Sequence, residues 1–278
     1  MTKKKRIIIL AAVFVLAVVL CAIYFFAVKP KIPPKPISLS ANNISTENVS
    51  LIAHRGFSAK APENTEASFI EAGKAGFFAA ECDIQLSKDN VWVVNHNADI
   101  DKMTDGTGKI SDLTYNEISK FTVDNGYHLK EHMGQHLITL DRYLEICNEY
   151  NIVPQIEVKE GNYTCLEDIL TALDKFDGMR EKAIIISFDG VILEKLRNLD
   201  EDIQLWYLTQ KIEDKTLRLA KLNNYTIAFN HKNCDENMVQ KAQEQNINLS
   251  CWTVDSVKTY EYLYGLGIRN FTTNRLTY

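Results

Sequence analysis

The stretch LIAHRGFSAKAPENTEASFIEAGKAGFFAAECDIQLSKDNVWVVNHN, residues 51–97, alternates short apolar runs with polar segments. The first run ends in His54 and Arg55, and the second contains Glu81 and Asp83, two residues apart. Successive side chains of a β-strand point to opposite faces, so the two carboxylates are predicted to lie on one side of a strand. Charged groups at the ends of apolar strands are unusual, and they mark this stretch as the candidate site.

The alternation of strand and helix patterns continues to the C-terminus. Residues 64–76 have the pattern of an amphipathic helix with Asn64 as its predicted N-cap, and the longest break, 95–138, is predicted to be an insertion after the second strand. Further helices are predicted at 140–150, 164–176, 190–199, 213–223, 235–246 and 256–265. Strands are predicted at 50–54, 79–85, 152–158, 183–188, 203–208, 225–229, 247–254 and 268–273. This α/β order predicts a (β/α)₈ TIM barrel, with a doubly wound open sheet as the alternative.

A second strand repeats the arrangement of polar residues. Glu157 and Lys159 lie at the end of the run IVPQIEVK, as Glu81 and Asp83 lie in AAECDIQL. In a barrel the C-terminal ends of strands meet at one face, so three carboxylates would converge there. A hard divalent cation, Ca²⁺ or Mg²⁺, would relieve their repulsion, and oxygen ligands suit these ions better than zinc. An ion pair with Arg55 or Lys159 is the alternative explanation for a single buried carboxylate.

Two histidines complete the candidate site. His54 and His96 both follow apolar runs, and a histidine pair beside a cation can act as general acid and general base because each titrates near neutral pH. Arg55 and Lys159 are suited to binding phosphoryl oxygens, the arginine by a bidentate fork and the lysine as a point charge. The residue types therefore indicate phosphate chemistry.

Five motifs in order resemble the glycerophosphodiester phosphodiesterase family: His54-Arg55-Gly56, Pro62-Glu63-Asn64-Thr65, Glu81-x-Asp83, Val93-Val94-x-His96 and Ile156-Glu157-Val158-Lys159. The resemblance covers roughly 50–275 and implies a TIM barrel, one divalent cation, and hydrolysis of glycerophosphodiesters to glycerol 3-phosphate and an alcohol. The resemblance implies that the metal ligands are Glu81, Asp83 and Glu157. It also implies that the acid/base pair is His54 and His96, and that the phosphate-binding residues are Arg55 and Lys159. Trp252 is expected to line the substrate pocket or, alternatively, to pack the barrel.

The chain departs from the family pattern at two positions. Asn97 follows the second histidine where the family usually has Asp, which weakens any expected part of this side chain in orienting His96 or supporting the cation. The last strand ends in Thr273-Asn274-Arg275-Leu276 where the family usually has Thr-Asp-x-Pro, which puts the preference for the leaving group in doubt.

The N-terminus predicts a membrane-anchored protein. Residues 7–28 contain no charge, and at about 1.5 Å per residue they would span the hydrocarbon core of about 30 Å. A cleaved signal peptide is the alternative, but its apolar core is usually shorter, about 7–15 residues. Basic residues in 1–6 predict a cytoplasmic tail. Residues 29–49, rich in Pro and then Ser and Asn, are predicted to be a linker, so the domain at 50–278 would lie outside the cytoplasm.

Composition excludes some classes of protein. A net charge of −5 with no basic stripe beyond the first residues argues against nucleic acid as a partner. Only five cysteines lie outside the apolar segment, an odd number, which argues against a full disulfide framework.

Three functions remain in competition on the sequence alone. The first is a phosphodiesterase acting on glycerophosphodiesters or a related glycerophosphate at the cell surface. The second is a phospholipase of C or D type acting on intact lipid, which the tether favours and the polar 95–138 insertion disfavours. The third is a catalytically weak binding module, for which Asn97 and the altered last loop are the only support.

Overall fold

The computed structural model describes residues 34–278, as a single compact unit. The predicted cytoplasmic tail at 1–6 and membrane helix at 7–28 lie outside the described residues. Within 34–278, no helix is both long enough and apolar enough to span a bilayer.

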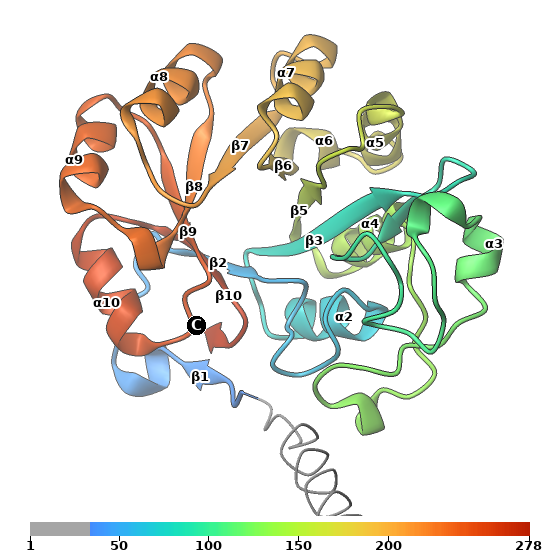
Figure 1. Ribbon diagram of the computed structural model, residues 1–278. Coiled ribbons are helices and arrows are strands. Elements are labelled where there is room, and N and C mark those ends of the chain that lie inside the picture. Colours follow the sequence, from blue (N-terminus) through green and yellow to red (C-terminus); the bar gives the residue numbers. More distant parts are fainter. Residues whose placement is uncertain (1–33) are drawn as a thin grey trace, which may run out of the picture. The chain divides into compact units, whose positions relative to one another are not determined.

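Eight parallel strands form a closed barrel, which confirms the predicted TIM-barrel architecture and excludes the open sheet (Figure 1). The strands are β2 (Ser50–Ala53), β3 (Ala79–Leu86), β5 (Val153–Val158), β6 (Ile184–Ser187), β7 (Gln204–Thr209), β8 (Thr226–Asn230), β9 (Leu249–Trp252) and β10 (Asn270–Thr273). Closure comes from β2, which pairs in parallel with β10 on one side and with β3 on the other. All eight lie within about two residues of the predicted ranges.

Helices follow the strands and surround the barrel (Figure 1). They are α2 (Glu66–Lys74), α4 (Leu140–Tyr150), α5 (Leu166–Leu173), α6 (Met179–Lys182), α7 (Gly190–Leu199), α8 (Asp214–Asn223), α9 (Glu236–Glu244) and α10 (Val257–Gly265). Each longer helix buries one apolar face; α4, for example, buries Tyr143, Leu144 and Cys147. Inside the barrel a separate apolar cluster includes Ile52, Ile184 and Trp206.

The N-cap of α2 differs from the prediction. Thr65, not Asn64, accepts the capping hydrogen bond, from the backbone N–H of Ser68. Asn64 has a positive φ of 56°, a conformation that Asn tolerates better than most residues, and its side chain turns toward β3 instead. Because Asn64 does not cap the helix, its side chain is available to contact Asp83 on β3.

The insertion at 95–138 has a small core of its own. It follows β4 (Trp92–Val94), which pairs antiparallel with β3, and it contains η2 (Ile110–Asp112), α3 (Tyr115–Ile118) and η3 (Leu129–Glu131). Its apolar side chains pack into a cluster with Val93. The segment predicted to be polar thus has an apolar core of its own, and it adjoins the barrel through the pairing of β4 with β3.

Part of the predicted linker at 29–49 is folded rather than extended. β1 (Ile37–Ser38) pairs in parallel with the C-terminal strand β11 (Leu276–Thr277), and η1 (Ser40–Asn42) follows it. Leu39, between them, is 0% exposed. This arm buries an apolar side chain against the barrel, which a pure spacer would leave in water.

Candidate active site

A cavity of about 250 Å³ opens among residues from the C-terminal ends of the barrel strands. This is the face at which a TIM barrel carries its chemistry. It brings together seven of the predicted residues, and an eighth, Asp83, contacts two of its lining side chains. The predicted residues that line it are His54, Arg55, Glu81, His96, Glu157, Lys159 and Trp252.

Three carboxylates meet at one side of this cavity. Glu81 and Asp83 lie on the same face of β3, and Asp83 is the register partner of Glu157 on β5. One oxygen from each of the three lies within 4.8 Å of the others. Their exposed fractions are only 2%, 1% and 9%, respectively. Two neighbouring parallel strands therefore concentrate negative charge in a buried place, as the sequence predicted.

Two cationic side chains pair with the same cluster. The Lys159 Nζ lies 2.6 Å from Asp83 Oδ1 and 2.5 Å from Glu157 Oε1. The Arg55 Nε lies 3.3 Å from Asp83 Oδ2, and its backbone N–H donates to Glu81 Oε2 at 2.8 Å. The ion pair considered as an alternative for a single carboxylate is thus present at both Asp83 and Glu157, whereas Glu81 accepts from the backbone N–H of Arg55.

The three carboxylates differ in the direction in which their pKa values are shifted. Burial and then the charge of Asp83 raise the pKa of Glu81 well above its ordinary value, and the same causes raise the pKa of Glu157 to about 7. Burial alone would also raise the pKa of Asp83, but the charges of Lys159 and Arg55 lower it instead. Without a further positive charge, the cluster therefore holds protons that it would release to a bound cation.

The residues present fit a divalent metal ion. The donor set consists of carboxylate oxygens, which Ca²⁺ and Mg²⁺ prefer, and a bound cation would offset the burial and the like charge that raise the pKa values of Glu81 and Glu157. Glu81, Asp83 and Glu157 would hold the ion.

The two histidines are each held through Nδ1 by an asparagine side chain. His54 Nδ1 lies 2.8 Å from Asn274 Oδ1, and His96 Nδ1 lies 3.0 Å from Asn97 Oδ1. Burial, followed by the charge of Arg55, lowers the pKa of His54 to about 4. Burial also lowers the pKa of His96. Both rings are therefore neutral near pH 7, and Asn97 still contacts its histidine despite its lack of charge.

Several residues of the site lacked an assigned role in the sequence analysis. Asn64 Nδ2 donates to Asp83 Oδ2 at 2.7 Å, and Arg55 NH1 donates to Glu63 Oε1 at 2.9 Å. The Pro62-Glu63-Asn64-Thr65 motif was the available signal for both. The departure at Asn274 put the preference for the leaving group in doubt, and the structure shows that this side chain contacts His54. No spacing rule connects positions 54 and 274, so this contact could not be read from the sequence.

The opposite side of the cavity is apolar. Trp252 and Phe188 meet edge to face, with ring centroids 5.7 Å apart, and Trp252 Nε1 donates to the carbonyl of Ala228 at 3.1 Å. Trp252 thus both lines the pocket and packs the barrel, the two roles expected for it. Ile186 and Leu208 extend the same wall. A bound molecule would meet charge on one side and aromatic surface on the other.

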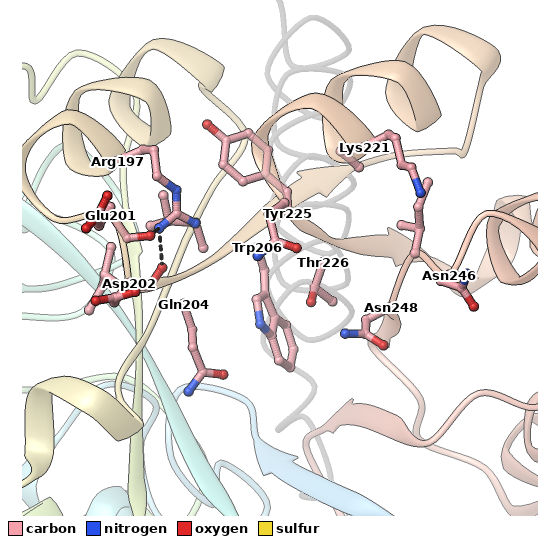
Figure 2. Close-up of a pocket in the computed structure, with 15 residues that line it drawn as sticks. Arg197, Glu201, Asp202, Gln204, Trp206, Lys221, Tyr225, Thr226, Asn246 and Asn248 are labelled. Carbon is pink, nitrogen blue, oxygen red and sulfur yellow. Dashed lines mark hydrogen bonds between the residues drawn. The ribbon is translucent and has the colours of Figure 1, made fainter.

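A second cavity, of about 350 Å³, lies at the other end of the strands (Figure 2). Its lining includes the first residues of β7 and β8, and Trp206 contributes to both cavities. Its two basic side chains donate to backbone carbonyls: Arg197 NH1 donates to those of Glu201 and Ile203 at 2.6 and 2.9 Å (Figure 2), and Lys221 Nζ donates to that of Gln245. The lining offers no counterpart to the carboxylate and histidine set, so the first cavity is the candidate active site.

Comparison with known proteins agrees with this site. The Glycerophosphoryl diester phosphodiesterase family matches residues 54–277. A glycerophosphodiester phosphodiesterase of Caldanaerobacter subterraneus is 30% identical over 229 residues, covering 81% of this chain and 93% of the relative. Glycerophosphodiester phosphodiesterase 1 of Homo sapiens is 31% identical over 158 residues, covering 56% of this chain and 48% of the relative.

A solved structure supports the fold. A phosphodiesterase of Oleispira antarctica, in complex with the product sn-glycerol-3-phosphate, matches with a TM-score of 0.76 at 22% identity. The match covers 86% of this chain and 96% of that one. The family match over residues 54–277 and the Caldanaerobacter relative show that this chain belongs to the glycerophosphoryl diester phosphodiesterase family and is a phosphoric diester hydrolase.

Proposed function

We propose that the protein hydrolyses glycerophosphodiesters to glycerol 3-phosphate and an alcohol, with one divalent cation, Ca²⁺ or Mg²⁺, as cofactor. The observation that carries the proposal is the cavity itself, which two histidines line together with Glu81 and Glu157, the third carboxylate of the cluster, Asp83, lying beside them. The names of the relatives and the product bound in the Oleispira structure supply the substrate class.

Five charged residues on one side of the cavity would bind the cation and the phosphate. Glu81, Asp83 and Glu157 would hold the cation, which supplies Lewis-acid stabilisation of charge on the phosphate when bound. Arg55 and Lys159 bind the phosphoryl oxygens. Both side chains contact Asp83, which holds them in place before the substrate binds. A substrate phosphate can therefore pair with charged groups that are already positioned.

The histidines move the protons. One neutral ring accepts the proton of the attacking hydroxyl, which is either water or the 2-OH of the glycerol, the latter giving a cyclic phosphate. The other ring donates a proton to the leaving alkoxide. Because an anion close to a histidine favours its charged form, binding of the phosphodiester raises the pKa of the ring that must act as acid.

We propose further that the enzyme works at the outer face of the cell membrane. The support is the charge-free stretch at 7–28 with basic residues before it. The N-terminus would be cytoplasmic, the helix would cross the membrane once, and the barrel would face outward, close to glycerophosphodiesters released from lipids.

The test measures release of glycerol 3-phosphate from glycerophosphocholine by the full chain in detergent, with Ca²⁺, Mg²⁺ or EDTA. Turnover that EDTA abolishes and one of the ions restores is expected, and Glu81→Gln should remove it. Glu261→Gln, on the exposed side of α10, is the matched control and should turn over normally. Turnover of lysophospholipid in place of glycerophosphocholine would favour a phospholipase, and metal binding without any turnover would favour a binding module.

A further inference from the structure

Asn274, at the end of β10, lies between His54 and Asp255. Its Nδ2 donates to Asp255 Oδ2 at 2.6 Å, and its backbone N–H donates to Asp255 Oδ1 at 2.8 Å. Its Oδ1 lies 2.8 Å from His54 Nδ1 and accepts a hydrogen bond from Ser58 Oγ at 3.0 Å. The three side chains form a line from the loop after β9 to the cavity.

The charge of Asp255 decides which way the Asn274 amide points. A carboxylate accepts hydrogen bonds and donates none, so the NH₂ end of the amide must face it. The oxygen end must then face His54. Further contacts hold the arrangement, since Thr273 Oγ1 also donates to Asp255 and the N–H of Ala59 donates to the carbonyl of Asn274.

The orientation of the amide in turn decides where the proton of His54 lies. An amide oxygen only accepts, so Nδ1 of the neutral ring must carry the proton. The lone pair is then on Nε2, on the side of the ring away from Asn274. A base that faces the substrate needs its lone pair there, and a ring in the other tautomer would present an N–H instead.

We propose that Asp255, acting through Asn274, holds His54 in the Nδ1–H tautomer and so makes Nε2 the nitrogen that exchanges a proton with the substrate. Asp255 and Asn274 are positioning residues. The inference rests on the proposed function, since it assigns the working nitrogen of one of its two histidines.

The other histidine lacks this device. His96 Nδ1 also contacts an amide oxygen, that of Asn97, but within residues 34–278 no acceptor holds the Nδ2 of Asn97. The Asn97 amide is therefore free to reverse. The contacts of Asn274 thus fix one tautomer at His54, whereas Asn97 can serve either tautomer of His96.

The first variant is Asp255→Asn. Its new NH₂ would face that of Asn274, which reverses to offer its oxygen to residue 255 and its NH₂ to His54. His54 must then carry its proton on Nε2. A catalytic histidine in the wrong tautomer loses about 10⁴-fold in kcat in the serine-protease case, so we expect kcat to fall by about 10²–10⁴-fold with KM little changed. Asp168→Asn, on the exposed side of α5, is the matched control and should keep full activity.

The second variant exchanges the two residues. Asn274→Asp alone places a carboxylate within 2.6 Å of another and should be strongly impaired. The double variant Asn274→Asp/Asp255→Asn restores a donor facing an acceptor at both contacts, so we expect it to recover most of the kcat lost by either single variant. The direct carboxylate should also move the acidic limb of the pH–rate profile to higher pH, because it favours the charged form of His54.

The tautomer itself is read independently of activity, from the ¹⁵N chemical shifts of the His54 ring in the full chain in detergent. We expect Nδ1–H in the wild type and Nε2–H in Asp255→Asn, with circular dichroism confirming that both are folded. The proposal is overturned by Nε2–H in the wild type, by an unchanged tautomer and kcat in Asp255→Asn, or by a double variant no better than the single ones. A wild type with Nδ1–H but no turnover would contradict the proposed function and leave the assignment of the tautomer intact.

Discussion

His54 and His96 reach the same cavity from separate parts of the chain, one after β2 and the other after β4. Neither ring belongs to an apolar core cluster, so replacing it should leave the barrel folded. We expect His54→Ala and His96→Ala each to lower kcat by about 10²–10⁴-fold, the usual contribution of general acid–base catalysis. His136→Ala, in the exposed part of the insertion, is the control and should be near wild type. A wild-type kcat in either active-site variant would contradict its role in proton transfer.

The raised pKa values of Glu81 and Glu157 predict how metal binding depends on pH. In the metal-free protein both groups bind protons more tightly when folded than when unfolded, so their contribution to stability is present at low pH and is lost as the pH rises, for Glu157 through its pKa of about 7. A divalent cation replaces those protons. The increase in Tm caused by Ca²⁺ or Mg²⁺ should therefore be larger at pH 8 than at pH 5, and smaller at pH 8 in Glu157→Gln. An increase that is equal at both pH values would contradict the assignment of these ligands.

At single residues, the sequence was informative where chemistry and spacing coincide. Glu81 and Asp83 share a strand face by the period of two, and the structure places them together. The roles of Asn64 and Asn274 were harder to predict. An asparagine at the boundary of a helix or strand can be explained locally, by capping or by a turn, without a distant partner. Their contacts with Asp83 and His54 depend on closure of the barrel, which brings the first and last strands side by side.

At the level of elements, the arm formed by β1 and η1 is the feature that the sequence analysis missed. Its strand has only two residues, and its partner β11 lies about 240 positions later, so no local pattern reveals it. Long alternating strands and amphipathic helices, in contrast, carry their own pattern and were located closely. The arm joins the site indirectly, because the N–H of Ile37 donates to the carbonyl of Arg275, next to Asn274.

The arm should contribute measurably to stability. Leu39 is fully buried, so Leu39→Ala should lower the free energy of unfolding by about 2–5 kcal/mol, the range for deleting a buried leucine side chain. Leu222→Ala makes the same change at a residue that is 82% exposed and should stay within about 0.5 kcal/mol of wild type. Chemical denaturation measures both. Equal effects of the two substitutions would mean that the arm does not pack as described.

The apolar wall contributed by β6, β7, β8 and β9 predicts an effect on binding rather than on proton transfer. Trp252→Ala removes the edge-to-face contact with Phe188 and the aromatic surface of the pocket. We expect KM to rise roughly tenfold, while kcat changes by less than about threefold, because the contact is made equally before and during reaction. Trp252→Phe keeps a ring and should lie between. A loss confined to kcat would assign the tryptophan to catalysis instead.

At the scale of the whole molecule, charged and apolar side chains come from different strands around one cavity. β2, β3 and β5 supply the charged groups, while β6 to β9 supply apolar surface. Because the strands are parallel, all of their C-terminal ends open at one face, and the substrate can be held across the barrel axis with its phosphate on one side. The opposite end of the barrel contains the second, polar cavity. Its side chains make contacts that stabilise the fold, such as those of Arg197 with backbone carbonyls (Figure 2).

The proposed membrane orientation predicts where the barrel meets an added protease. Basic residues in 1–6 outnumber those directly after the apolar stretch, so the N-terminus should stay in the cytoplasm and the 50–278 domain should face outward. Protease added to intact cells should therefore degrade the barrel and spare a cytoplasmic marker, and the chain should sediment with membranes until residues 1–33 are deleted. Replacing Lys3, Lys4, Lys5 and Arg6 with Ser should produce a mixed orientation with partial protection. Full protection of the wild-type barrel until the cells are broken would place it in the cytoplasm, and its substrate would then have to come from the inner leaflet or from soluble glycerophosphodiesters.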